Sequence, residues 1–387
     1  MIPHVTRHHA LWVVAGLLAA LLAGRAALAG AADQVFQKGA EKPLVVYITS
    51  ETYDEIKTTG GGPSFNPMGI DHIVYGDRPQ AFHEGEEMRK QGRYEEAIRY
   101  YEAALRTPPT MTRHELLDPA CYYSIALCLL EDGSDLAAAE AKFKELLEKS
   151  PKTRLYPDAL FGLGRVMVRA KKYDAAVAQF EKLIKIAVEK SWEEWTYQGY
   201  LGKAQALLEL EKYKDALAAA NKTADARYTD IRIQGESIKA QIYVRQGEYA
   251  QAAKLLRELV DKLAPEVARE IERNTGSRMQ RTEAQCYNAL GHCYLKQGTK
   301  NKSDKNKSDD DIREAALSFL WTVVLHQRQP AEHAEALFYA AECFTKLKDN
   351  SRATELRNEL TEKYPDSPYS RQIRPATEAP AKKESAK

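Results

Sequence analysis

Hydrophobic and polar positions change their period once along this chain, just before residue 79. Between residues 43 and 76, β-branched and aromatic residues alternate with polar ones, and a Gly-Gly-Gly-Pro stretch interrupts the alternation. The alternation predicts strands at 44–49, 51–58 and 70–75. From residue 79 onward, apolar residues recur at three- and four-residue spacing, which is typical of amphipathic helices. The pattern therefore predicts a small β module followed by a long helical region.

The helical region repeats one short pattern of small and aromatic residues. Its clearest copy is GRYEEAIRYYEAALRTPP at residues 92–109, where Ala97 is followed one turn later by Tyr101. A small residue lets two helices approach closely, and the ring fills the space beside it. We therefore expect the alanine of each copy to lie at a contact between helices. The equivalent alanines are Ala139, Ala176, Ala216, Ala252, Ala315 and Ala353.

Other residues of each copy fit two helices joined by a tight turn. Gly92 and Gly247 stand just before the second helix, where a left-handed backbone is common. Prolines such as Pro109 follow the second helix, since a proline inside a helix costs about 3 kcal/mol. The tyrosine that opens the second helix is expected in the core in four copies, at Tyr94, Tyr173, Tyr213 and Tyr249.

Leu-Gly pairs at 163–164 and 290–291, with Met167 and Tyr294 three residues later, stand one helix before two of the alanines. With the alanine copies, this pattern resembles the tetratricopeptide repeat family, with about seven repeats covering residues 79–368. The resemblance implies an all-α fold, a right-handed solenoid of α-helical hairpins, here with the small β module before it. The alanines are 36 to 63 residues apart, more than the about 34 residues of a standard repeat. We therefore expect longer helices or linkers than the family has.

Less regular stretches surround and interrupt the array. We expect a linker at 30–42, and the β module at 43–76 resembles the short SH3-like or Sm-like segment that precedes helical repeats in some exported bacterial proteins. The polar stretch at 299–311 predicts a flexible low-complexity loop, and the composition of 369–387 predicts a disordered tail.

Residues 1–29 have the three-part pattern of a secretory signal peptide, with Arg7 in a short basic region, an apolar run at 10–23 and small residues near Ala29. We expect cleavage after Ala29, with Ala31 as the second choice. The alternative is a retained anchor, but this apolar run is shorter than the about 20 residues that span a bilayer. The pattern predicts an exported protein of the periplasm or cell envelope, without stable membrane insertion after cleavage.

Charge and cysteine content narrow the possible partners. The 56 basic and 55 acidic side chains leave a net charge of +1, so nothing favours nucleic acid as a partner. Cys121 and Cys128 are seven residues apart, as are Cys286 and Cys293, which is too far along one helix for a disulfide. We expect the cysteines to be small buried residues. The sequence has no ligand spacing typical of a metal site, and no cofactor is expected.

No catalytic motif stands out in the sequence. It contains no GxSxG, no P-loop and no GxGxxG. Acidic pairs such as Glu95-Glu96 lie on predicted amphipathic helices, where a solvated face is expected. An enzyme would need a site assembled from scattered residues, so we expect a non-enzymatic protein.

The resemblance implies that the first helices of successive hairpins line a concave surface that binds a polypeptide. Carboxamides offer a donor and an acceptor to an extended backbone, and basic residues at the edges favour acidic or C-terminal segments. The competing interpretation is an ordinary solvated surface, because glutamine is common on exposed helices. The candidate groove residues are Gln198, Gln205, Gln234, Gln241, Gln285, Asn288, His292, Arg165 and Arg245.

The sequence thus predicts an interaction scaffold of the bacterial cell envelope that holds a partner polypeptide in its groove. An alternative function is a structural or glycan-associated envelope protein, in which the array is a spacer and the β module binds. The identity of the partner and the oligomeric state stay open.

Overall fold

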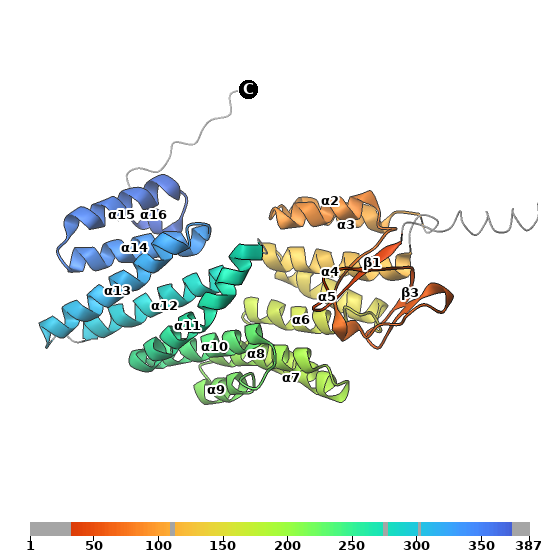
Figure 1. Ribbon diagram of the computed structural model, residues 1–387, viewed down its shortest axis with the longest axis horizontal. Coiled ribbons are helices and arrows are strands. Elements are labelled where there is room, and N and C mark those ends of the chain that lie inside the picture. Colours follow the sequence, from red (N-terminus) through yellow and green to blue (C-terminus); the bar gives the residue numbers. More distant parts are fainter. Residues whose placement is uncertain (1–31, 109–112, 274–277, 301–302, 374–387) are drawn as a thin grey trace, which may run out of the picture. The chain divides into compact units, whose positions relative to one another are not determined.

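Seven helical hairpins follow a small β module along the chain (Figure 1). The computed structural model describes residues 32–108, 113–273, 278–300 and 303–373. The chain divides into two compact units, Met1–Gly202 and Lys203–Lys387. The expected signal peptide, and the expected tail from residue 374 onward, lie outside the described residues.

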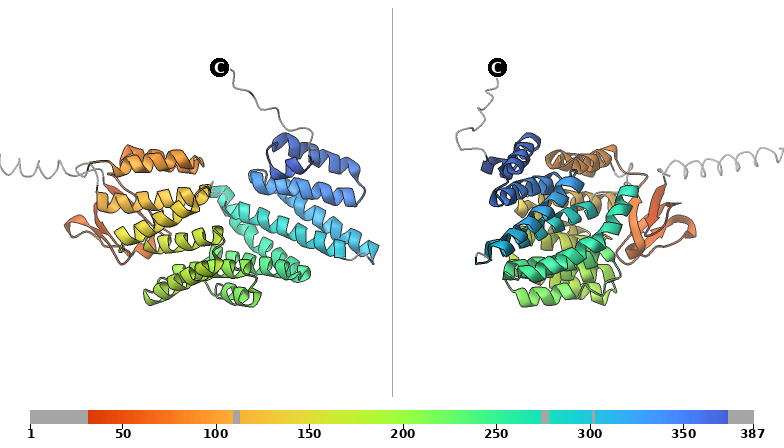
Figure 2. Two further views of the ribbon diagram at one scale, coloured as in Figure 1. Left: turned by 180° about the vertical axis from the view of Figure 1, so that it is seen from behind. Right: turned by 60° about the vertical axis from the view of Figure 1, so that its left-hand side comes forward.

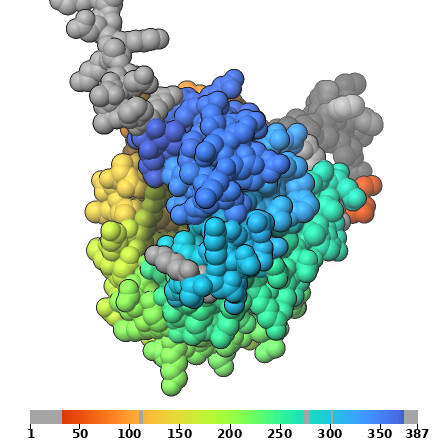
Figure 3. All heavy atoms as spheres, turned by 90° about the vertical axis from the view of Figure 1, so that its left-hand side faces the viewer, coloured from red at the N-terminus to blue at the C-terminus, as the bar shows by residue number. Residues whose placement is uncertain are grey.

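The hairpins pair α2 with α3, and so on to α14 with α15, and the boundary between the units falls within α8. The helices are α2 Gln80–Lys90, α3 Tyr94–Leu105, α4 His114–Asp132, α5 Leu136–Lys149, α6 Tyr156–Arg169, α7 Tyr173–Glu189, α8 Glu193–Glu209, α9 Tyr213–Asn221, α10 Thr229–Gln246, α11 Tyr249–Arg273, α12 Arg278–Lys300, α13 Lys305–Leu325, α14 Pro330–Lys346, α15 Asn350–Lys363 and α16 Pro368–Ile373. In the second unit, the atoms of α12 to α15 follow one another from cyan to blue in the space-filling view of Figure 3.

The repeated alanine is the centre of each hairpin contact. At all seven positions the alanine is 0% exposed, which confirms the prediction from the pattern. The aromatic residue one turn later is buried as well, at Tyr101, Phe143, Phe180 and Phe319.

Glycines on first helices make room for these rings. A Cβ on Gly164 would lie 2.5 Å from the ring of Phe180, and one on Gly291 would lie 2.7 Å from the ring of Phe319. Any larger residue there would overlap the ring, so this contact explains the Leu-Gly pairs of the repeat.

The tyrosines that open the second helices are placed differently from the prediction. Tyr94, Tyr173, Tyr213 and Tyr249 are partly buried rather than core residues. Each is the first residue of its helix, where the hairpin partner covers only one side of the ring. The turn glycines behave as expected, since Gly92 and Gly247 have φ angles of 73° and 77°, a left-handed conformation that glycine adopts without strain.

The β module consists of two small antiparallel sheets that lie against the first hairpins (Figure 2). One has the strand order β2-β1-β5 and the other pairs β3 with β4. The strands are β1 Asp33–Gln37, β2 Leu44–Val46, β3 Ile48–Glu51, β4 Ile56–Thr58 and β5 Ile70–Val74. Its core includes Val35, Ile56 and Phe65, and it is completed by Leu116 of α4. Three short strands are marginal alone, and the helix supplies the missing cover.

Two boundaries of the β module differ from the prediction. The expected linker at 30–42 contains β1, which is the central strand of its sheet. Of the expected strand at 51–58, residue 51 ends β3 and residues 56–58 form β4. Strand β1 was missed because its only fully buried apolar residue is Val35, and its burial depends on strands far away in the sequence. The resemblance to SH3-like or Sm-like segments stays a prediction.

Two predicted irregular segments contain helical residues in their described parts. Of the expected loop at 299–311, residues 299–300 end α12 and residues 305–311 begin α13. The carboxylate of Asp304 accepts a hydrogen bond from the backbone N–H of Lys307 at 3.1 Å and caps α13. The expected tail begins with α16, where the buried Ser370 donates to the carbonyl of Tyr364 at 2.6 Å. Polar composition misled the prediction here, because the Asp304 cap and the Ser370 hydrogen bond are contacts that composition does not reveal.

Candidate functional site

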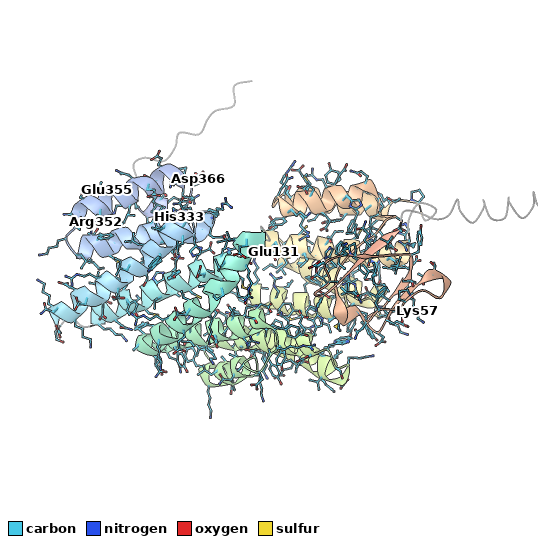
Figure 4. All side chains as sticks on the ribbon, viewed as in Figure 1. Lys57, Glu131, His333, Arg352, Glu355 and Asp366 are labelled. Carbon is cyan, nitrogen blue, oxygen red and sulfur yellow. The ribbon has the colours of Figure 1, made fainter. Side chains whose placement is uncertain are left out.

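Two of the predicted groove residues lie in the first unit and do not share a described cavity. Arg165 on α6 is exposed, and its Nη2 lies 2.9 Å from Oε1 of Glu131, which Figure 4 labels on α4. Gln198 lies partly exposed on α8. These two positions fit an ordinary solvated surface.

Gln205 and Gln234, in the second unit, use their amides within their own helices. The Gln205 amide donates to Oε1 of Glu209 at 3.1 Å. The Gln234 amide donates to the carbonyl of Asp230 at 3.2 Å. Neither residue lines a described cavity of this unit.

Four predicted residues do come together, in a groove of about 590 Å³ between α10 and α12. Gln241 and Arg245 come from α10, and Gln285 and His292 come from α12. We call this cavity the α10–α12 groove. The remaining lining residues are Ser237, Ala240, Val244, Tyr249, Leu256, Cys286, Ala289 and Lys296.

The α10–α12 groove combines an apolar floor with polar edges. Ala240, Leu256 and Cys286 are buried residues of its floor. At its edges, Arg245 contacts Glu209 of α8 at 3.5 Å, and the exposed Lys296 has no ion-pair partner among the described residues. The described charges that line the groove are thus basic.

Two acidic residues of α14, which the sequence interpretation did not single out, hold the α12 side of the groove. Glu332 Oε1 accepts from Nε2 of Gln285 at 2.9 Å and from Nε of Arg281 at 2.7 Å. Glu335 Oε1 lies 2.9 Å from Nε2 of His292. The two glutamates are three residues apart on a first helix, which places them on one face. This spacing is the sequence feature from which their shared role could have been predicted.

Asn288 does not face a ligand as predicted. It is 2% exposed, and its Nδ2 donates to the carbonyl of Glu332 at 2.9 Å and to Oε2 of Glu335 at 3.0 Å. Burial of Glu335 opposes its ionisation, but the hydrogen bonds from His292 and Asn288 outweigh burial and lower the pKa of this carboxyl. Asn288 therefore joins α12 to α14. The repeat pattern placed Asn288 on the ligand-facing side of α12, but α14 covers that part of the helix.

The first unit has a separate cavity of about 400 Å³ beside the β module, α2 and α4. Its charged residues largely satisfy one another. Glu51 accepts from Nε of Arg154 at 2.6 Å, and Glu86 accepts from Nη2 of Arg89 at 2.8 Å and from the hydroxyl of Tyr101 at 2.6 Å. Arg78 also lines this cavity, and its buried Nε and Nη1 atoms have no hydrogen-bond partner among the described residues, so polar groups remain that a ligand could bind.

Other kinds of site find no support in the described residues. All five cysteines are buried and unbridged, as expected, and burial raises the pKa of each thiol to about 12. The described part of the chain contains no group of histidine, cysteine and acidic residues placed to hold a metal ion. No helix within the described ranges is long and apolar enough to cross a membrane.

Comparison with protein families identifies the hairpins. Three family models, each described as tetratricopeptide repeat, match residues 84–153, residues 129–193, and residues 238–265 with 335–367. These matches fall on α2 to α7, on α10 with α11, and on α14 with α15. A search of curated proteins finds no match.

Several solved structures have a similar arrangement of helices. A tetratricopeptide repeat protein from Parabacteroides merdae is 11% identical, with 77% of this chain and 97% of that chain covered and a TM-score of 0.48. PilF of Pseudomonas aeruginosa is 15% identical, with 66% and 96% covered and a TM-score of 0.42. The apo form of RapI is 16% identical, with 76% and 79% covered and a TM-score of 0.47. These distant likenesses carry no argument about function. From the family matches at residues 84–193, 238–265 and 335–367, together with the hairpins and their buried alanines, we conclude that this chain contains tetratricopeptide repeats.

Proposed function

We propose that this protein binds a partner polypeptide in the α10–α12 groove and catalyses no reaction. Tetratricopeptide arrays generally present such surfaces to other proteins. The observation that carries the proposal is the make-up of the groove, in which Gln241 and Gln285 stand over an apolar floor with Arg245 and Lys296 at its edges.

The chemistry of the groove favours a short acidic segment with an apolar side chain. Its volume of about 590 Å³ lies within the about 300–1,000 Å³ of typical ligand sites. The carboxamides can pair with a peptide backbone, and the two cations can pair with a side-chain or C-terminal carboxylate. At about 0.5–1.5 kcal/mol for each hydrogen bond, with the apolar contact added, micromolar affinity at about −8 kcal/mol is expected.

The α14 acids prepare this surface before any ligand arrives. Glu332 holds the amide of Gln285, and Glu335 holds the imidazole of His292. Side chains that are already ordered lose less rotamer entropy on binding. The acids thereby support the binding function without themselves lining the groove.

A charge reversal in the groove tests the proposal. Three proteins are used to recover partner polypeptides from an envelope extract. They are the wild-type full chain, a double variant that carries Gln241→Ala and Lys296→Glu, and the control variant Lys254→Glu. Lys254 is exposed on α11 and lies outside the groove. We expect the double variant to lose at least tenfold in affinity for the recovered partner, measured by calorimetry, and the control to retain it. Equal binding by all three proteins would overturn the assignment.

A second candidate function places binding on the β module. Its exposed apolar side chains favour this possibility, since Leu44, Val45, Tyr47 and Val74 are 44%, 67%, 41% and 43% exposed. Replacing Val45 and Tyr47 with serine separates the candidates, because binding in the groove would be unchanged and binding by the β module would be lost. We also propose that either function is carried out in the periplasm or cell envelope, on the basis of the signal pattern at residues 1–29.

A further inference from the structure

The C-terminal half of α13 carries an apolar surface that no described part of the chain covers. Leu317, Trp321, Val324 and Leu325 are 53%, 52%, 63% and 53% exposed. Their spacing places them on one side of the helix, and we call them the α13 stripe. Val188 on α7 is 59% exposed but stands alone on its helix, and single exposed hydrophobic residues are ordinary.

The α13 stripe is not part of the core of the second unit. The core is built from other residues of α13, among them Ala315, Phe319 and Val323. The helix α13 itself lies between α12 and α14 and contacts both (Figure 1). A helix that is apolar on two sides is typical of one that is covered on both. The ring of Trp321 stacks on Tyr287 of α12, with centroids 6.1 Å apart and planes at 22°. The indole is therefore already ordered, which lowers the entropy lost on contact with a partner.

Charged residues flank the α13 stripe with opposite signs. Glu314 lies seven residues before Trp321, and Arg328 lies seven residues after it. Glu314 is 50% exposed and has a weak contact with Arg257 of its own chain, at 3.4 Å. Arg328 is exposed and has no ion-pair partner among the described residues. One end of the surface is thus acidic and the other basic.

This order makes the surface complementary to itself. If two copies of α13 cross antiparallel at Trp321, Leu317 of one copy faces Leu325 of the other. Glu314 of one copy then lies at the same end of the contact as Arg328 of the other, which stands in the turn after α13. A parallel crossing would instead bring like charges together. We propose that the α13 stripe is the contact between two copies of this chain, related by a two-fold axis at Trp321.

The extent of the stripe sets the expected strength of this dimer. Apolar patches of this kind cover on the order of a few hundred Å², less than the about 800 Å² that each partner buries in a stable complex. We therefore expect dissociation in the micromolar range. No residue of the α13 stripe lines the α10–α12 groove, so the inference goes beyond the proposed function and does not depend on it. A dimer would carry two grooves and bind a two-site partner with added avidity.

Sedimentation velocity of the full chain, from about 1 to about 100 µM, measures the expected change from monomer to dimer. Trp321→Glu and, separately, Leu325→Glu should remain monomeric throughout, with circular dichroism confirming that both variants are folded. Val188→Glu places the same charge at an exposed apolar residue outside the stripe and should dimerise as the wild type does. A wild-type chain that stays monomeric at every concentration would overturn the proposal.

Charge exchange tests the antiparallel arrangement itself. Glu314→Arg and Arg328→Glu should each weaken the dimer at least tenfold, and the double variant should restore it because each new pair is again complementary. If Glu314→Arg weakened the dimer only by breaking the contact with Arg257 in the same chain, adding Arg328→Glu would not restore dimerisation. Failure of the double variant to dimerise would contradict the proposed two-fold arrangement.

Discussion

At the scale of single residues, burial sets the properties of the ionisable groups. Asp158, in the first turn of α6, is an example of a partly buried carboxyl. Burial raises its pKa to about 6, and the Arg154 guanidinium only partly opposes the rise. The folded state thus holds this proton more tightly than the unfolded chain, where an aspartate titrates near about 3.9.

The raised pKa predicts that Asp158 destabilises the folded first unit at neutral pH. Below pH about 4 both states are protonated, and as the pH rises from about 4 to about 6 the unfolded state loses its proton first, so stability falls. Asp158→Asn should match the wild type near pH 4 and exceed it by about 3 kcal/mol in unfolding free energy at pH 7. Urea unfolding followed by circular dichroism at several pH values measures this difference.

A difference between the wild type and Asp158→Asn that does not grow with pH would contradict the assignment. The matched control is Asp54→Asn, at an exposed residue whose contact with Lys190 is 3.1 Å. Exposed pairs contribute little, so this control should change the unfolding free energy by less than about 1 kcal/mol.

At the scale of elements, the β module belongs to the helical array rather than standing beside it. The guanidinium of Arg113, at the start of α4, pairs with Asp33 of β1 at 2.7 Å and with Asp77 after β5 at 2.8 Å. Asp33 is 0% exposed and also accepts from the backbone N–H of Ile48 at 2.8 Å. One side chain thus ties two strands and the segment after β5 to the second hairpin. Deleting residues 36–76 would expose this contact, so point substitutions are the better test of what the β module binds.

Arg113→Met should destabilise the first unit by about 3–5 kcal/mol, because it leaves the buried carboxylate of Asp33 without its cation. Arg93→Met removes an exposed arginine whose Nη2 pairs with Glu96 at 2.5 Å, and it should leave the unfolding free energy nearly unchanged. Thermal unfolding of both variants gives the comparison. Equal effects would show that the Arg113 contacts are not what joins the β module to the helices.

The helical elements were easier to predict than the strands for a local reason. The alanine and aromatic residues of a hairpin, such as Ala97 and Tyr101, act within one short segment, and their spacing alone places them at the contact. A short strand such as β1 has only Val35 as its buried apolar residue, and its neighbours β2 and β5 are chosen by long-range pairing. The polar start of α13 was missed for a related reason, because its capping residue Asp304 resembles a loop residue in composition.

At the scale of the whole molecule, the proposal of export makes a prediction about the mature chain. The small residues around Ala29 fit a signal peptidase site, so the exported protein should begin at Gly30. Intact mass and N-terminal sequencing of protein recovered from the periplasm of a bacterial host would establish this. Ala29→Lys should block processing. Full-length protein in the cytosol would contradict export, and full-length protein held in the membrane would favour a retained anchor.

The candidate groove was predictable in part. Gln241, Arg245, Gln285 and His292 were found from repeat register, because equivalent positions of successive first helices face the same side. Asn288 shares that register but is covered by α14, and register alone does not reveal which neighbour covers a face.

The repeat, the hairpins and the buried alanines could be predicted from residue order alone, because these features depend on spacing within about 40 residues. Which polar side chains are free to contact a ligand depends on the tertiary structure. Glu332 and Glu335 orient Gln285 and His292 and hold the buried Asn288. Arg113 joins α4 to the β module, and the α13 stripe is left uncovered. Each of these outcomes depends on residues from other elements, so no local pattern can contain it.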